Sequence, residues 1–236
     1  VEKDEKVMAI ITVDEYAEDK YLFFVTTGGI VKRTPIQEFE SIRKTGKIAI
    51  SLREGDQLLN VKEVKDDTIV GIAADTGKMV NFLASEVRPM GRTASGVKGI
   101  ELEEGSETVG ITTSLEGRYI LSITNKGFGK MSDATDYRIT KRGAKGVTTL
   151  KTTDKIGKLV TVRAVDGDED LMVITVGGIV IRTPLSQVRV AGRNTQGVKI
   201  INLEPRQRVS SIAIVDHEEP EEEAVVECEE TVNPEE

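Results

Sequence analysis

The chain has 236 residues, of which 38% are apolar and 31% are charged, and its formal net charge is −8. No apolar run approaches the roughly 20 residues of a membrane-spanning helix, and residues 1–10 lack the basic-then-apolar pattern of a signal peptide. His217 and Cys228 are the only histidine and cysteine, which excludes a disulfide framework, a zinc site and a Cys–His nucleophile. The single cysteine also favours a reducing, cytoplasmic setting.

The predicted elements are short strands, beginning with the apolar run VMAIITV at residues 7–13. From residue 21 a hairpin pattern recurs, in which a β-branched run, a glycine turn and a second short run follow each other. The turn glycines are Gly29, Gly77, Gly127 and Gly178, spaced 48, 50 and 51 residues apart. Glycine supplies the positive φ that a tight hairpin needs, so the recurrence predicts four related units.

Each unit continues with a basic loop that contains a second glycine. These glycines are Gly46, Gly96, Gly146 and Gly197, spaced 50, 50 and 51 residues apart. After each we predict a strand (IAISL, VKGIEL, VTTL or VKIINL), then a polar turn and one further strand. Two longer matches support the repeat: GGIVKRTP at 28–35 returns as GGIVIRTP at 177–184, and RTASGVKGIEL at 92–102 returns as RNTQGVKIINL at 193–203.

About four short strands per unit, with no long helical stretch, are typical of the blades of a β-propeller. One blade cannot cover its own apolar faces, so the units must stack. We therefore predict an all-β propeller-type domain with four complete repeats over residues 21–215. Residues 1–20 are predicted to be the remnant of a preceding blade, which suggests a piece cut from a longer chain.

Residues 216–236 form a strongly acidic segment, with 11 acids and no bases. Without them, 29 acids stand against 32 bases, so the remaining body is mildly basic. A block of like charge repels itself and buries little apolar area, so we predict a disordered acidic tail.

The cations of the basic loops are the candidate binding residues, because they recur at matching positions of the repeat. They are Arg43, Lys44, Lys47, Arg92, Lys98, Lys141, Arg142, Lys145, Arg193 and Lys199. One such loop would be ordinary polar surface, but four at equivalent places predict a curved basic belt. Arg and Lys contact phosphates without reading bases, so the belt indicates sequence-independent nucleic-acid binding.

Other motifs carry little chemistry. DGDED at 166–170 lacks the glycine and glutamate spacing of an EF-hand loop, and no Gly-Lys pair is followed by the Ser or Thr of a P-loop. No carboxylate pair lies in an apolar context. We therefore predict no catalytic centre, metal site or cofactor within this chain.

The quoted repeats, with FESIRKTGKIAISL at 39–52, resemble the C-terminal domain of the DNA gyrase A subunit over residues 1–215. The resemblance implies a β-pinwheel in which strand exchange links adjacent blades. It also implies a basic rim that wraps double-stranded DNA, so that the ATP-dependent holoenzyme introduces negative supercoils. Its implied partners are the N-terminal part of the same subunit and the ATPase subunit in an A2B2 heterotetramer, at the nucleoid of a bacterial cytoplasm. ATP and Mg would bind in other domains.

One departure concerns the signature box of that family, which reads Gln, basic, Arg, Gly, Gly, basic, Gly in the first blade. The nearest match here is TKRGAKG at 140–146, with Thr140 for Gln and Ala144 for Gly. By its order this copy lies in a late blade, so we interpret it as a degenerate copy and an auxiliary phosphate contact. The usual domain has about six blades, so the box-bearing blade is expected to precede this sequence.

Three alternatives remain open from the sequence. The matching domain of topoisomerase IV would recognise DNA crossings for decatenation, without strong wrapping. A protein-binding propeller scaffold would expose aromatic hot spots, which 4% aromatic residues disfavour. A propeller enzyme would cluster titratable groups at its central channel. The tail either competes with DNA for the belt or is a solubilising terminus, and deleting 216–236 would distinguish these two roles.

Overall fold

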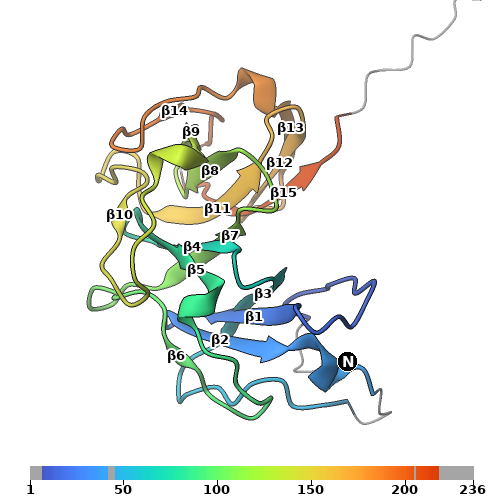
Figure 1. Cartoon of the computed structure of the whole chain (residues 1–236). Coiled ribbons are helices and arrows are strands. Elements are labelled where there is room, and N and C mark those ends of the chain that lie inside the picture. The colour runs from blue at the N-terminus through green and yellow to red at the C-terminus, as the bar shows by residue number, and fades with distance from the viewer. Residues whose placement is uncertain (1–6, 42–45, 205, 218–236) are drawn as a thin grey trace, which may run out of the picture.

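A computed structural model of the chain describes residues 7–41, 46–204 and 206–217. The described residues fold into short strands and a few single-turn 3-10 helices, and the strands form four antiparallel sheets, one for each repeat. Figure 1 shows the sheets following one another from the blue N-terminal end to the orange C-terminal end. This arrangement confirms the predicted all-β repeat architecture. No helix in the described part of the chain has the length and apolar character needed to span a membrane.

Each repeat contributes a hairpin and one further long strand to its sheet. In the first repeat, β1 (Tyr21–Thr26) and β2 (Ile30–Pro35) form the hairpin, and β3 (Leu58–Val64) pairs with β1. The hairpin turn uses Gly29 at a φ of 74°, as the repeat predicted. The corresponding strands of the later repeats are β4 (Ile69–Ala74), β5 (Lys78–Leu83) and β7 (Thr108–Thr113); β8 (Tyr119–Thr124), β9 (Phe128–Asp133) and β11 (Leu159–Val165); and β12 (Asp170–Thr175), β13 (Val180–Pro184) and β15 (Val209–Val215).

The outer strand of each of the first three sheets comes from the following repeat. β6 (Val97–Lys98) pairs with β2, β10 (Val147–Thr148) pairs with β5, and β14 (Val198–Lys199) pairs with β9. We call the stretches that carry these strands, residues 88–99, 138–149 and 189–200, the crossing segments. They provide the exchange of strands between neighbouring blades that the resemblance implied.

The strands predicted after the basic loops are shorter than expected. Of VKGIEL at 97–102, only Val97 and Lys98 pair with a neighbouring strand, and IAISL at 48–52 forms no strand. The reason lies in the path of the crossing segment, which pairs briefly with β2, β5 or β9 and then turns across the hairpin end. There the Gly99 backbone N–H donates to the Gly29 carbonyl at 2.8 Å, and the two later crossing segments repeat this bond.

The core lies within and between the sheets. Phe23 of β1 and Phe82 of β5 are fully buried, and their ring centroids lie 6.2 Å apart across the first two sheets. A second apolar cluster joins the third and fourth sheets through residues such as Leu121 and Leu171. Neighbouring repeats therefore cover each other's apolar faces, which is the reason that such units occur in series.

The predicted strand at residues 7–13 is not formed. Ala9, Ile11 and Val13 instead pack their side chains against a cluster on the first sheet that includes Leu22 and Phe24. The segment is therefore held by apolar side-chain burial and not by a backbone ladder.

The fourth sheet has three strands, β13-β12-β15, in the described residues. In this part of the chain, nothing pairs with the outer edge of β13. Val180 is consequently 52% exposed, whereas Val31 at the equivalent place in β2 is fully buried. The turn shows the same difference: a Cβ at Gly29 would touch Ile100 at 2.9 Å, but a Cβ at Gly178 would touch nothing.

Candidate nucleic-acid interface

Most of the predicted belt residues lie in the crossing segments. Arg43 and Lys44 lie outside the described residues, and Lys47 lies in the loop of the first repeat. The other seven lie in the three crossing segments: Arg92 and Lys98; Lys141, Arg142 and Lys145; and Arg193 and Lys199. The fold thus places these cations along the outer edges of three consecutive sheets.

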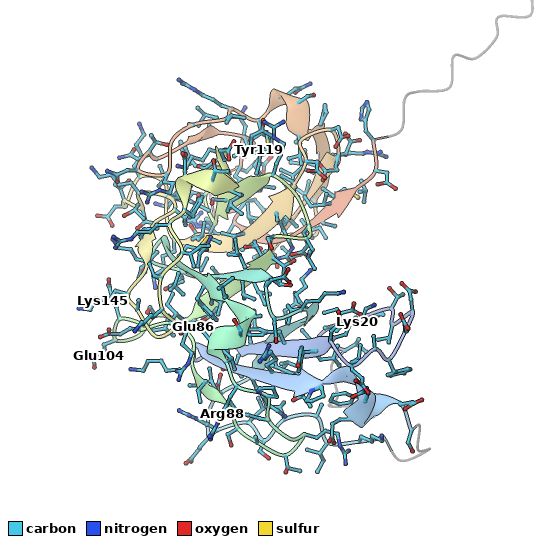
Figure 2. The ribbon with its side chains drawn as sticks, viewed as in Figure 1. Lys20, Glu86, Arg88, Glu104, Tyr119 and Lys145 are labelled. Atoms are coloured by element: carbon cyan, nitrogen blue, oxygen red, sulfur yellow. The ribbon has the colours of Figure 1, made fainter. Side chains whose placement is uncertain are left out.

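The lysines of this set are the accessible members. Lys98, Lys141, Lys145 and Lys199 are all exposed. Figure 2 shows Lys145 on the outer side of the molecule, where Glu104 also lies. An exposed ammonium group on a flexible stem can reach a phosphate without any rearrangement of the backbone.

The arginines of the same set are half-buried and already engaged with protein groups. Arg142 donates from Nε to the Glu86 carbonyl and from Nη1 to the Lys98 carbonyl, both at 3.1 Å. Arg193 donates from Nη1 to the Thr148 carbonyl at 3.0 Å, and its guanidinium lies 5.7 Å from the centre of the Tyr137 ring.

These two arginines therefore connect each crossing segment to the preceding one, and we call them the clip arginines. Arg92 occupies the equivalent position and pairs with Glu38 of the first repeat, with 3.5 Å between Nε and Oε2. Hydrogen bonds to backbone carbonyls fix loop position, so the clip arginines hold the lysine-bearing loops in register.

Two buried lysines, which the repeat pattern did not single out, support the same loops. Lys32 of β2 and Lys130 of β9 are fully excluded from solvent. The Lys32 Nζ donates to the carbonyls of Ala49 and Arg92, and the Lys130 Nζ donates to those of Gly192 and Arg193 at 2.5 and 2.7 Å. Each lysine thus anchors the backbone of a crossing segment beside a belt arginine.

The environment of these lysines is unfavourable for charge. Burial lowers the pKa of both Lys32 and Lys130 to about 8, and the positive charges of Arg92 and Arg193 act in the same direction. The sequence signal for them was a lysine at the same position of the second hairpin strand in two repeats. The equivalent positions of the other two repeats hold Val80 and Ile181.

No group of three or more His, Cys, Asp or Glu side chains in the described residues is arranged to hold a metal ion. DGDED at 166–170 instead forms a turn, in which Glu169 accepts backbone hydrogen bonds from Asp166 at 3.0 Å and Gly167 at 2.7 Å. These bonds lower the pKa of Glu169, against the effect of its partial burial. The acidic cluster therefore has a structural role in this turn.

Comparison with known proteins places this arrangement in a family. The family described as DNA gyrase C-terminal domain, β-propeller, matches residues 20–65, 72–114, 118–166 and 169–216, one stretch for each repeat. The chain belongs to this family. The resemblance drawn from the repeats is thereby confirmed.

Curated relatives of the chain are A subunits of DNA gyrase. The Ureaplasma parvum protein is 47% identical over 91% of this chain, and a Staphylococcus aureus protein is 39% identical over 94%. The chain spans about a quarter of the length of these relatives, 25% in both cases.

Solved structures show the same fold. The C-terminal domain of DNA gyrase A is 26% identical with a TM-score of 0.79, and the match covers 91% of this chain and 72% of that one. The C-terminal domain of DNA topoisomerase IV has a TM-score of 0.84 over 92% of this chain and 68% of that one, but is only 23% identical. That likeness shows the fold alone. Because the curated relatives at 39–48% identity are gyrase A subunits, the topoisomerase IV alternative is not favoured.

Proposed function

We propose that this chain is a non-catalytic domain that binds duplex DNA along its outer edge and bends it. The observation that carries the proposal is the repetition of exposed lysines on consecutive crossing segments: Lys98, Lys141, Lys145 and Lys199. The strand exchange places these segments on adjacent sheets, so a bound duplex would follow a curved line of charge. Membership of the gyrase A C-terminal family supports the same function.

Binding would be largely independent of sequence. Lysine ammonium groups neutralise phosphates as point charges and do not read base edges. Each phosphate that a lysine neutralises releases a counterion, so the affinity should fall steeply as salt rises.

In the longer protein, the bent DNA would be presented to the rest of the enzyme. The chain spans only a quarter of its gyrase A relatives, so strand passage, ATP and Mg would belong to other parts of the assembly. We propose the N-terminal part of the same subunit and the ATPase subunit as its partners, with negative supercoiling as the joint activity.

The direct test is fluorescence anisotropy with a labelled duplex between about 50 and 200 mM salt. We expect a steep linear fall of log affinity with log salt. Changing Lys98, Lys141, Lys145 and Lys199 to Gln should reduce the slope by up to about 3.6, since each phosphate contact contributes about 0.9. The control changes four exposed lysines outside the crossing segments to Gln: Lys65, Lys151, Lys155 and Lys158. A salt-independent affinity, or an equal loss in both variants, would contradict the proposal.

A further inference from the structure

Three arginines begin the crossing segments, and the predicted belt does not include them. Arg88, Arg138 and Arg189 each lie four residues before a belt arginine, at the same position of three repeats. All three are exposed. Figure 2 shows Arg88 beyond Glu86, on the loop that leaves the second hairpin. We call these residues the arginine row.

The backbone of the arginine row is held firmly on both sides. Each arginine follows a buried residue that ends a 3-10 turn: Val87, Tyr137 or Val188. Each is followed by a residue that bridges to the second hairpin strand of the preceding sheet (β2, β5 or β9), in the pairs Arg33 with Pro89, Asn81 with Ile139, and Met131 with Val190. The three arginine Cα atoms therefore occupy equivalent places on successive sheet edges.

Their side chains, in contrast, have no partner among the residues that the structure describes. In the described part of the chain, none of the three guanidinium groups forms a hydrogen bond, an ion pair or an aromatic contact. The belt arginines four residues later, Arg92, Arg142 and Arg193, all contact protein groups. Packing and fold stability thus account for the clip arginines but not for the arginine row.

The positions around the arginine row change between repeats while the arginine stays. Two residues before it stand Glu86, Asp136 and Gln187, and directly after it stand Pro89, Ile139 and Val190. In the first repeat, the residue that follows the packed Phe39 is the exposed Glu40. An arginine therefore occupies this position in the three repeats whose crossing segment bridges to a preceding described sheet, and the first repeat has a glutamate there.

We propose that the arginine row is a second line of DNA contacts, in which each guanidinium binds a phosphate of a duplex that also meets the belt lysines. This inference rests on the proposed function and adds residues to its site. The guanidinium fork matches two phosphate oxygens, and a preformed backbone lowers the cost of ordering it. A row of unpaired positive charges on three adjacent edges also repels itself, which a polyanion would relieve.

The test compares two triple variants with equal loss of charge. The first is R88Q/R138Q/R189Q, and the control is R53Q/R118Q/R208Q, whose arginines are exposed but lie outside the crossing segments. We expect the first variant to lower the salt slope of duplex binding by about 2.7 and the affinity at about 0.1 M salt by about tenfold or more. The control should change both much less, and both variants should melt at the wild-type temperature because the positions are surface sites.

The single variants R88Q, R138Q and R189Q give a second measurement, and each should remove about a third of the slope change. If the wild-type chain binds duplex DNA but the first triple variant matches the control, the arginine row is not a contact and the proposed function stands. If the wild-type chain shows no salt-dependent binding, the proposed function itself fails.

Discussion

The guanidinium of Arg142 and the backbone carbonyl of Lys98 lie 3.1 Å apart and join two crossing segments that come from different repeats. One repeat later, Arg193 makes the matching bond to Thr148 at 3.0 Å. Cations that look alike in the sequence therefore have separate tasks. The clip arginines fix the loops, and the exposed lysines remain available for a ligand.

The first prediction separates these tasks with two substitutions in one loop. R142Q removes two hydrogen bonds to carbonyls and should lower the free energy of unfolding by about 1–2 kcal/mol. K145Q, three residues away and exposed, should stay within about 0.5 kcal/mol of the wild type. Urea denaturation measures both. Equal stabilities for the two variants would show that Arg142 is not a clip.

The second prediction concerns the buried lysines and pH. The pKa of Lys32 and Lys130 in the folded chain is about 8, below the ordinary value of 10.5. Between these two values the unfolded chain binds more protons, so their contribution to the free energy of unfolding rises with pH from about 8 to 10.5. Below pH 8 both states are protonated, and the contribution is constant at its lowest value.

The variant K32M/K130M isolates this effect, because it lacks both groups while keeping all other titrating lysines. We expect the stability of the wild type, relative to this variant, to increase as pH rises through the window. Denaturation curves at several pH values measure the difference. Parallel pH profiles for the two proteins would mean that neither lysine has a lowered pKa.

The third prediction uses two valines at equivalent positions. Val31 is fully buried under the crossing segment, whereas Val180 is 52% exposed on the outer edge of β13. V31A should therefore cost about 2 kcal/mol of stability, through lost burial and a small cavity, and V180A should cost less than about 0.5 kcal/mol. Thermal melts of the two variants compare them directly. A similar loss in both would indicate that something covers β13 in solution.

Much of the fold followed from the sequence because its signals are periodic. The hairpin glycines recur at nearly constant spacing, and the positive φ of Gly29 and Gly178 shows why glycine is kept there. The strand exchange could not be derived from periodicity. β6 is only two residues long, too short for an alternation pattern, and its partner β2 lies in another repeat.

The positions of the basic loops came from the sequence, and the DNA-binding role of their cations stays a prediction. The period of about 50 residues located the basic loops, but it could not distinguish an exposed Lys145 from a clip Arg142. That difference depends on a carbonyl presented by another repeat. The arginine row was visible in the same alignment of repeats, because Arg88, Arg138 and Arg189 share one position. The basic loops are recognised by the residues around their loop glycines. The three arginines precede those residues in the chain, so the predicted belt did not include them.

The central claim is that duplex DNA follows the outer edges of consecutive sheets and is wrapped along them, which changes the writhe of a closed DNA circle. It is tested most directly by binding the chain to relaxed plasmid DNA and relaxing the unconstrained supercoils with a type I topoisomerase. The linking number is then measured after the protein is removed. We predict a shift in linking number that grows with the ratio of protein to DNA and is lost in the variant with Lys98, Lys141, Lys145 and Lys199 changed to Gln. An unshifted distribution at saturating protein would contradict the claim.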